Sequence, residues 1–477
     1  MTEITPIFTR LDEPLVYDNS VEGTEIDEIP CDKTSIQNLN QANNQFRFHY
    51  SGDFGYLMAS PDSGFLVKCR FRTRDNNATN MNSNITLASN WFGYLFEDVQ
   101  LRLGGTTLEH IRHIGVVTDV FYHMENNEFR HQTGELVSFV PDTSSEISDT
   151  IGTRQGNVVG VDSAAVIASV NNANQRNIQT NENYNEGFVR RRKLYNYTVV
   201  ANDDYRDIEL FIPLNRIFSF CDEVNRLLKY IPFEIILTRS GNNTHCYYGT
   251  NNTALDFGNN DSGITSITLQ LERVKMRPDI ASDLEKLYKK PFNVAYYKRI
   301  CENAATQVGT QRTFACSKTM TESDEGLCRY VFCIFKSHAN DTAQTNYQRC
   351  CHANISNISV RYGGSVYPLL SQNADWNRNQ YSRFYKEFIK VSKCLGNSSP
   401  GLSMQEFRDL FTIYAIDLSA QAIVSPTNQL TINVERRDVP AQNAETLQNP
   451  RKLDAFFVII SEAKIQIACL NKVTRKI

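Results

Sequence analysis

The chain has 477 residues, of which 41% are hydrophobic and 21% are charged, and it contains 27 Phe and 22 Tyr. This composition excludes a chain that is disordered throughout, and the length exceeds what one hydrophobic core usually supports, so we expect two fused halves. With 49 basic and 53 acidic residues, the formal charge of -4 gives no general electrostatic reason to bind nucleic acid or a membrane surface.

The sequence also indicates where the chain is made. Its first residues, MTEITPIFTR, lack the basic and apolar regions of a signal peptide, and no stretch reaches the roughly 18 apolar residues that span a bilayer. We therefore expect a soluble protein made in the cytosol. Its 12 cysteines should then be reduced and buried thiols, most of them within apolar strand patterns such as those around Cys69, Cys333 and Cys469.

Residues 12–32 form an acidic stretch with little periodicity. Such a stretch is typical of an arm that becomes ordered on assembly, and equally of a frayed terminus. We assign residues 1–45 to an N-terminal arm and leave both alternatives open.

From residue 46 onward, short runs of alternating apolar and polar residues dominate. The first run carries its apolar residues at Phe65, Val67, Cys69 and Phe71, and similar runs lie at residues 99–103, 267–271, 430–434 and 465–469. Alternation of this kind predicts strands with one face on a core, and Gly, Asn, Asp and Pro separate the runs. The pattern favours a sandwich or jelly roll over a parallel α/β sheet.

Three helices are predicted between the strands. Apolar residues recur at helical spacing over residues 109–130 and again over 381–395. The third, DIASDLEKLYKK, is short and charged and lies between Pro278 and Pro291. Because prolines bracket it, we interpret residues 279–291 as a connector between domains 46–278 and 292–477.

An internal repeat supports this division. VQLRLGG from Val99 is echoed by ISVRYGG from Ile358, and in each half a polar run and one of the two amphipathic helices follow. Three further pairs occur in the same order, namely ELFIPLNRIF with DLFTIYAIDL, FEIILTRS with LTINVERR, and ITLQLERVKM with AKIQIACL. The sequence therefore predicts an all-β fold of two tandem eight-stranded jelly rolls with a few short helices in the loops. Residues 144–187 and 240–263 are expected to form long displayed loops.

A metal site is the first functional alternative. His110, His113, His123 and Glu109 resemble metal ligands, but no matching downstream ligand set follows them, which favours a surface helix. Cys328, Cys333, Cys350 and Cys351 lack C-x-x-C spacing and are interpreted as strand-packing residues. No metal ligand is assigned.

A basic run and the familiar catalytic motifs complete the survey. The run at residues 190–193, RRRK, could bind phosphate or act as a nuclear import signal, but a solvated loop edge or a salt bridge to another subunit is favoured. The serine-hydrolase elbow, the phosphate loop and the dinucleotide-binding glycine motif do not occur in the sequence. No catalytic or cofactor-binding residue is assigned, and we do not expect an enzyme.

Several long segments resemble the double jelly-roll major capsid proteins of the Polinton (Maverick), adintovirus and Polinton-like virus group. They are FRFHYSGDFGYLMASPDSGFLVKCRF from Phe46, LFEDVQLRLGGTTLE, LFIPLNRIFSFCDEVNRLLKYIPFEIILTRS, GLSMQEFRDLFTIYAIDLSAQ and FFVIISEAKIQIACL. The resemblance spans most of the chain and rests on the order and spacing of the segments, since none is a catalytic signature.

The resemblance implies a hexon-like homotrimer whose six rolls form a pseudo-hexagonal capsomer of an icosahedral shell around double-stranded DNA. It further implies a single jelly-roll penton protein as partner and a location in the virion, with synthesis in the host cytoplasm and assembly in the nucleus as one route. Whether an internal membrane is present stays open, and no sequence-specific nucleic acid is implied.

Two alternatives remain. A double jelly roll also serves carbohydrate-binding proteins and hydrolases, although Trp91 and Trp376 are few and isolated for a sugar-binding cleft. A host-domesticated descendant that still trimerises has the same packing requirements as a working coat protein.

Overall fold

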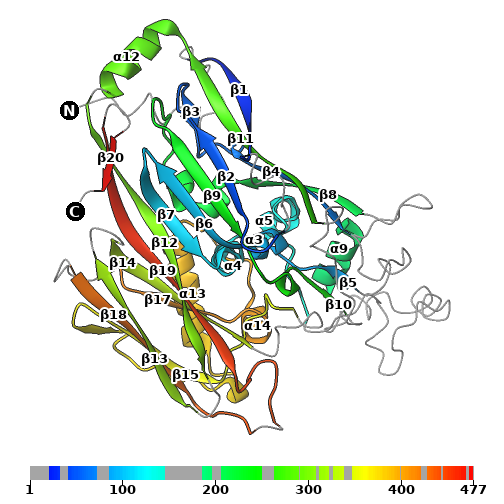
Figure 1. The fold of residues 1–477 in the computed structure, drawn as a ribbon. Coiled ribbons are helices and arrows are strands. Elements are labelled where there is room, and N and C mark those ends of the chain that lie inside the picture. Colours follow the sequence, from blue (N-terminus) through cyan, green and yellow to red (C-terminus); the bar gives the residue numbers. More distant parts are fainter. Residues whose placement is uncertain are drawn as a thin grey trace, which may run out of the picture.

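The computed structural model describes residues 21–32, 41–71, 85–144, 185–195, 206–249, 263–288, 290–307, 311–321, 326–337, 346–397, 399–420, 427–441, 444–468 and 472–475. Within these ranges the protein is mostly β, with four larger antiparallel sheets (Figure 1). The remaining parts of the two loops expected at 144–187 and 240–263 lie outside the described residues, apart from the short elements given below.

The first roll consists of two sheets. One contains, in spatial order, β1 (Val21–Pro30), β11 (Gly263–Met276), β4 (Gly64–Phe71) and β8 (Arg206–Pro213), with β3 (Tyr56–Leu57) also paired to β11. The other contains β2 (Gln45–Tyr50), β9 (Phe233–Arg239), β6 (Phe96–Leu103) and β7 (Thr106–Arg112). β5 (Ile85–Leu87) and β10 (Tyr247–Gly249) pair separately.

The second roll repeats this arrangement. One sheet contains β12 (Phe292–Gln307), β19 (Leu453–Ala468), β14 (Leu327–Ser337) and β17 (Ile413–Asp417), with β20 (Lys472–Arg475) also paired to β19. The other contains β13 (Thr313–Thr321), β18 (Thr427–Arg436), β15 (Ile355–Tyr362) and β16 (Ser365–Tyr367).

The two rolls have the same topology. When the eight principal strands of each roll are numbered in chain order, leaving out β3, β5, β10 and β20, the sheets read 1-8-3-6 and 2-7-4-5 in both rolls. The repeated segments fall on strands of equal rank: β6 and β15 are fourth, β8 and β17 sixth, β9 and β18 seventh, and β11 and β19 eighth. The predicted pair of jelly rolls and the internal repeat are therefore confirmed.

The repeated Gly-Gly pair has a clear structural reason. Gly104 and Gly105 have φ of 53° and 78°, and Gly363 and Gly364 have φ of 58° and 87°. Two successive positive φ values define the tight hairpin turn that matches the twist of antiparallel strands, and glycine adopts them without strain. Each pair thus joins the fourth strand of its roll to the fifth.

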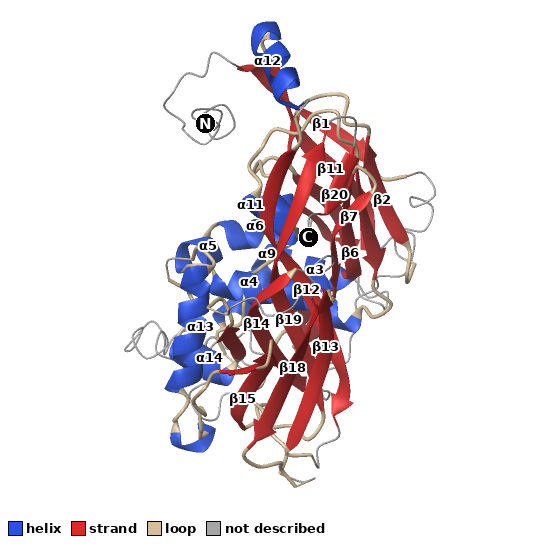
Figure 2. Cartoon of the chain, turned by 90° about the vertical axis from the view of Figure 1, so that its left-hand side faces the viewer, coloured by secondary structure: helices blue, strands red, loops and turns tan. Residues whose placement is uncertain are grey.

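Most helices gather on one side of the sheets, whereas the helix at residues 278–288 lies apart at the top of the view (Figure 2). In the first roll they are α3 (Trp91–Leu95), α4 (Ile114–Met124), α5 (Asn127–His131), α6 (Thr133–Leu136), α9 (Glu186–Tyr195), α10 (Leu214–Ile217), α11 (Ser219–Glu223) and the 3-10 turn η3 (Thr244–Cys246). The others are α12 (Pro278–Tyr288), η5 (Trp376–Arg378), α13 (Ser382–Cys394) and α14 (Met404–Asp409). Among the described residues, none of the helices is both long and apolar enough to cross a bilayer.

The helix predicted at 381–395 is confirmed by α13, and α12 confirms a helix between Pro278 and Pro291. The helix predicted at 109–130 is wrong in its first residues, since Glu109 to Arg112 belong to β7. The Gly104–Gly105 turn folds this segment back onto β6, and the ladder of hydrogen bonds overrides its helical spacing. Helix α4 then starts at Ile114, after His113 in the left-handed region with φ of 50°.

The expected N-terminal arm also needs correction. Residues 1–20 and 33–40 lie outside the described ranges, but Val21–Pro30 form β1, which pairs antiparallel with β11 from Val21 to Pro30. Ion pairs from Arg273 to Glu25 and from Lys275 to Glu22 accompany the pairing. Acidic residues that show no hydrophobic periodicity are thus held in an edge strand by basic residues opposite them.

Alternation along the strands places the core as predicted. Phe65, Val67, Cys69 and Phe71 are all buried, whereas Lys68 and Arg70 between them are exposed. β14 differs, because it is buried at nearly every position, which indicates that both of its faces are covered. The buried side chains of the two rolls form one continuous apolar cluster, so the rolls meet over an extensive internal junction.

Candidate assembly site at the junction of the two rolls

The junction begins where β7 of the first roll lies beside β12 of the second, as Figure 1 shows. The Tyr296 hydroxyl on β12 donates to the Leu108 carbonyl oxygen on β7, with 3.1 Å between the oxygens. The Tyr296 ring meets Phe220 edge-on, with 5.4 Å between ring centroids. Arg299, three residues further along β12, lies over the Phe121 ring at 3.8 Å and close to Asp222.

Two carboxyl groups are held at this contact by backbone N–H groups. Glu109, fully buried on β7, accepts from the backbone N–H of Phe220 at 2.6 Å, at the start of α11. Glu223 accepts from the backbone N–H of Tyr297 at 3.0 Å. Burial raises the pKa of each carboxyl to about 7, although the hydrogen bonds and Arg299 act in the opposite direction.

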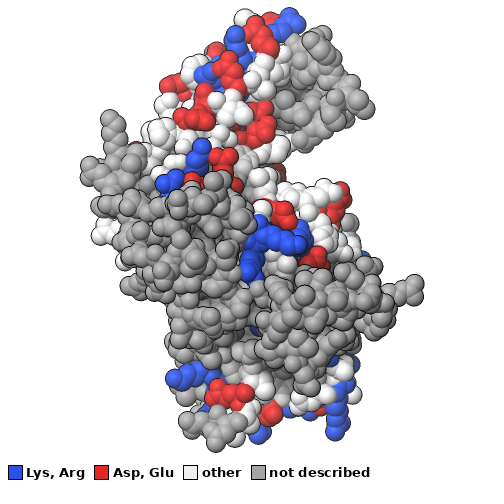
Figure 3. Space-filling view, turned by 90° about the vertical axis from the view of Figure 1, so that its right-hand side faces the viewer, with Lys and Arg blue, Asp and Glu red and all other residues white. Residues whose placement is uncertain are grey.

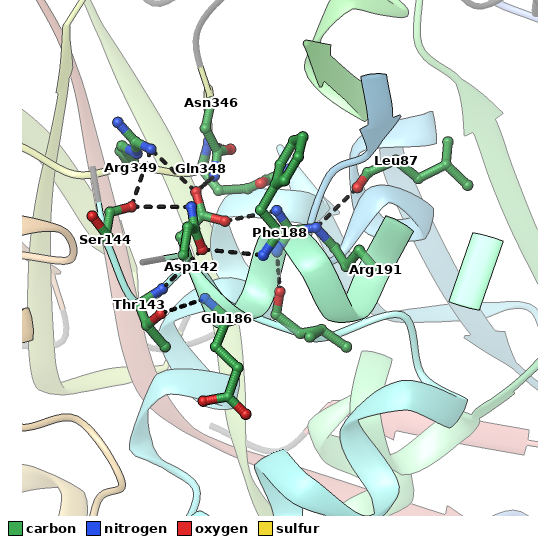
Figure 4. Close-up of polar contacts among 12 residues, drawn as sticks. Leu87, Asp142, Thr143, Ser144, Glu186, Phe188, Arg191, Asn346, Gln348 and Arg349 are labelled. Carbon is green, nitrogen blue, oxygen red and sulfur yellow. Dashed lines mark hydrogen bonds and ion pairs between the residues drawn. The ribbon is translucent and has the colours of Figure 1, made fainter. Parts of the chain in front are cut away.

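A second contact is an ionic cluster centred on Asp142 (Figure 4). Both carboxylate oxygens are used: one accepts from Arg191 of α9 at 2.6 Å, and the other from Asn346 at 2.7 Å and Arg349 at 3.3 Å. Arg191 also donates to the Leu87 carbonyl oxygen at 3.0 Å. Asn346 and Arg349 precede β15 in the second roll, so the cluster ties the segment after α6 of the first roll to the second.

The side chains of Arg191 and Asp142 have no exposed surface. Charges taken out of water are tolerated only when they are paired and fully hydrogen-bonded, because their desolvation costs several kcal/mol per ion. Such a cluster favours one relative orientation of the two rolls, since any other leaves a buried charge without its partner.

A third contact surrounds Lys336 on β14, which is fully buried. Its ammonium group donates to the Tyr94 hydroxyl at 2.9 Å and to the Tyr347 carbonyl oxygen at 2.8 Å. The Tyr94 hydroxyl in turn donates to Asp119 on α4, which also accepts from Asn90 at 2.8 Å. Burial raises the pKa of Asp119 to about 6, while the positive charge of Lys336 lowers it. The network again crosses from the first roll to the second.

The three histidines considered as metal ligands lie beside different groups of the chain. His110 on β7 is 3.5 Å from Asp98, and His113 is 3.1 Å from Glu97. His123 is buried on α4 against the Phe411 ring, and burial lowers its pKa well below the usual value. In the described part of the chain, no three His, Cys, Asp or Glu side chains are arranged to hold a metal ion.

The expected surface helix is wrong, because α4 is buried at nearly every position. It lies between the rolls, where the apolar Ile, Val and Met side chains around its circumference all find contacts.

The prediction for residues 190–193 is also wrong in part. These residues belong to α9, where Arg191 is buried, whereas Arg190 pairs with Glu135 at 2.6 Å.

The cysteines mostly behave as expected. Nine of the described cysteines are buried free thiols, Cys316 is half-buried and Cys394 is exposed, while Cys469 lies outside the described residues. Cys328 and Cys333 lie on β14, as predicted. Cys350 and Cys351 are buried just before β15, where the Cys351 thiol donates to the Phe335 carbonyl oxygen at 3.3 Å, so they pack beside strands without belonging to one.

The ionic cluster around Asp142 was not predicted from the sequence, because its members are far apart along the chain. One signal was present. Phe188, Arg191 and Tyr195 share a helical face, and all three are buried, so an arginine on an apolar stripe indicated a buried partner.

Trp91 and Trp376 are also buried in the cores, which leaves neither available as a sugar-stacking platform.

The fold and this junction define a class of protein, namely two antiparallel jelly rolls fused in one chain by buried polar contacts. The model of a family described as a double jelly roll-like domain matches residues 164–447, which is more than half of the chain. The chain therefore belongs to this double jelly roll-like domain family.

Solved structures share the fold over almost the whole chain. A chain of the Sputnik virophage structure has a TM-score of 0.56 at 10% identity, covering 100% of this chain and 92% of that one. The mavirus major capsid protein has a TM-score of 0.51 at 11% identity, covering 95% and 90%. The PBCV-1 virus capsid model has a TM-score of 0.51 at 11% identity, covering 97% and 98%. No curated protein sequence matches the chain.

Proposed function

We propose that this chain is a major capsid protein, whose homotrimers form pseudo-hexagonal capsomers of an icosahedral shell around double-stranded DNA. The observation that carries the proposal is the identical 1-8-3-6 and 2-7-4-5 strand order of the two rolls. Structures with the same fold come from the Sputnik virophage, from mavirus and from the PBCV-1 capsid.

A physical argument connects the duplicated fold with a shell. Three chains around a threefold axis place six similar rolls in a ring, and such a ring packs against its neighbours in a nearly hexagonal array. The three polar contacts at the junction hold the two rolls of each chain in one orientation, which the ring requires. A freely hinged pair of rolls would not tile a surface.

The partners follow from this function. The chain binds copies of itself and neighbouring capsomers, and a single jelly-roll penton protein closes the shell where capsomers meet in fives. The face drawn in Figure 3 carries acidic and basic side chains interspersed over its described residues, which supports packaging without a sequence-specific grip on DNA. The protein is made in the host cytoplasm and resides in the virion.

The described residues also support a structural role over an enzymatic one. Glu109 and Asp119 are two of the carboxyl groups whose pKa burial raises. Both are buried in the junction and accept hydrogen bonds from the chain itself, so neither of these two faces an open cleft where a substrate could bind. Their environment is that of structural groups.

We further propose that α12 divides the chain into its two rolls. It lies between β11, the eighth strand of the first roll, and β12, the first strand of the second. On this division the first roll begins with β1 at Val21, earlier than the sequence predicts.

The test is the mass of the purified protein by multi-angle light scattering, followed by electron microscopy of the same peak. A trimer with a hexagonal outline, or closed shells, is the expected result. A compact monomer at every concentration would overturn the proposal and would favour the carbohydrate-binding or hydrolase alternative.

A further inference from the structure

One contact between the two rolls is made by one strand of each roll, and the equivalent strands of the opposite rolls lie at sheet edges. Within the chain, β7, the fifth strand of the first roll, packs beside β12, the first strand of the second roll. The corresponding fifth strand of the second roll is β16, and the corresponding first strand of the first roll is β1. Both β16 and β1 lie at sheet edges, each paired on one side only among the described strands.

The surface beside β16 is apolar and exposed. Leu369 and Leu370, which follow β16, are 88% and 78% exposed, the highest values among the large hydrophobic residues that the structure describes as exposed. They border a hollow of about 570 Å³ whose apolar lining includes Phe384 of α13 and Ile416 of β17. Adjacent exposed leucines beside an apolar hollow are typical of the centre of a protein interface. We name this surface, from Tyr367 to Leu370 with α13, the α13 hollow.

The charges around the two surfaces are complementary. α13 carries four basic residues, Arg383, Lys386, Lys390 and Lys393, and a single acidic one, Glu387. Asp417 of β17 also lines the hollow and pairs with Lys390 at 2.8 Å, so basic residues remain in excess there. β1 carries four acidic residues, Glu22, Glu25, Asp27 and Glu28, and no basic one. Glu22 pairs with Lys275 of β11, and Glu25 and Asp27 share Arg273, whereas Glu28 accepts a hydrogen bond from the neutral Gln270. Between the acidic residues of β1 stands Ile26, which is 52% exposed and could enter an apolar hollow. Opposite charges around an apolar contact steer association and fix its register.

We propose that β1 of a second copy of this chain docks against the α13 hollow, as β12 docks beside β7 within the chain. Because the donor and acceptor surfaces differ, the contact is head-to-tail, and three repeats of it close the ring. The inference rests on the proposed trimer and names the residues that build it.

The first test removes the apolar contact. Leu369→Asp with Leu370→Asp costs little in folding, because both side chains already face water, but it places two charges in the interface. The matched control is Leu447→Asp, since Leu447 is 45% exposed in the second roll and lies outside the lining of the hollow. Light scattering over a dilution series should show a trimer for wild type and control. The double variant should dissociate at a concentration about 10-fold higher or more.

Two results separate this inference from the proposed function. A wild-type trimer that the double variant leaves unchanged overturns the α13 hollow as the contact while the trimer stands, and assigns the hollow to another occupant. A wild-type monomer overturns the trimer and this inference together.

The second test identifies β1 as the occupant. Lys386→Glu on α13 and Glu28→Lys on β1 each reverse the sign of one exposed charge, and each alone should weaken the trimer. Combined in one chain, the two reversals restore the attraction and should return the dissociation midpoint toward that of wild type. Additive losses in the double variant would overturn the pairing of α13 with β1.

The third test distinguishes a head-to-tail contact from a twofold one. In a Cys394→Ser background, Ile26→Cys and Leu370→Cys are introduced together, and a short bis-maleimide is added to the trimer. The expected product is a covalent trimer, with none from either single cysteine. Dimers from Leu370→Cys alone would show that like surfaces meet, and would overturn the proposal.

Discussion

Arg191 of α9 and Asp142, which follows α6, form an ion pair of 2.6 Å in which neither side chain reaches solvent. The second oxygen of Asp142 accepts from Asn346 and Arg349 of the other roll, so one carboxylate serves both halves of the chain (Figure 4). Each group of the cluster is a hydrogen-bond or ion-pair partner of another. Removal of one therefore leaves the others buried without a partner in a medium of low dielectric constant.

Asp142→Asn should destabilise the protein by about 3–5 kcal/mol, because it leaves two buried guanidinium groups without their counter-charge. Asp207→Asn is the matched control. Asp207 pairs with Arg70 at the same 2.6 Å, but both side chains are largely exposed. The control should cost less than about 1 kcal/mol. Urea unfolding measures both, and equal losses would contradict the structural role of the buried cluster.

Lys336→Met tests the third junction contact. Met keeps the apolar stem but removes the ammonium group that lies beside the Tyr94 hydroxyl and lowers the pKa of Asp119. Without that charge, the pKa of Asp119 should rise above about 6, and its ionised form becomes more costly to bury. The loss of stability should therefore be larger at alkaline pH than at acidic pH. Unfolding of variant and wild type across this range measures the difference, and a loss independent of pH would contradict the coupling.

The sequence predicts the strands better than the junction. Alternation from Phe65 to Phe71 arises from local geometry, since every second side chain of a strand faces the same side, and the structure follows it. The repeat from Val99 to Ile358 identifies strands of equal rank for the same reason: the Gly-Gly turn and the strand before it are local features that each roll needs.

The failures share a physical cause. Residues 109–112 have the spacing of a helix, but pairing with β6 over long range decides their conformation. Arg191 lies in a run that reads as solvated, but Asp142, from a distant part of the chain, neutralises it. β1 has no hydrophobic alternation and is held by Arg273 and Lys275 across the ladder. In each case a residue remote in sequence supplies the decisive contact.

Glu109→Gln tests the pH dependence of the β7–β12 contact. Burial raises the pKa of Glu109 to about 7, above the value of about 4.3 of an unfolded chain. The folded state therefore binds the extra proton more tightly, and the stability contributed in this way is present below about pH 4 and lost as the pH rises through about 7. Gln cannot ionise, so the variant should lose less stability than wild type between about pH 5 and pH 8.

Urea unfolding at several pH values across that range measures the slope for each protein. Glu223 has a pKa that burial also raises to about 7, so a Glu109→Gln, Glu223→Gln double variant should have the flattest profile. A slope that neither substitution changes would mean that other groups govern the pH dependence.

The two Gly-Gly turns predict matched effects in the two rolls. The second glycines, Gly105 and Gly364, have φ of 78° and 87°, and a Cβ added at either meets no heavy atom within 4 Å. The cost of a substitution is therefore conformational and not steric crowding by neighbours. Ala should destabilise by about 1 kcal/mol at each position, and Asn by less, because Asn tolerates positive φ. Thermal unfolding of the four single variants measures this, and a large loss in one roll with none in the other would contradict the equivalence of the turns.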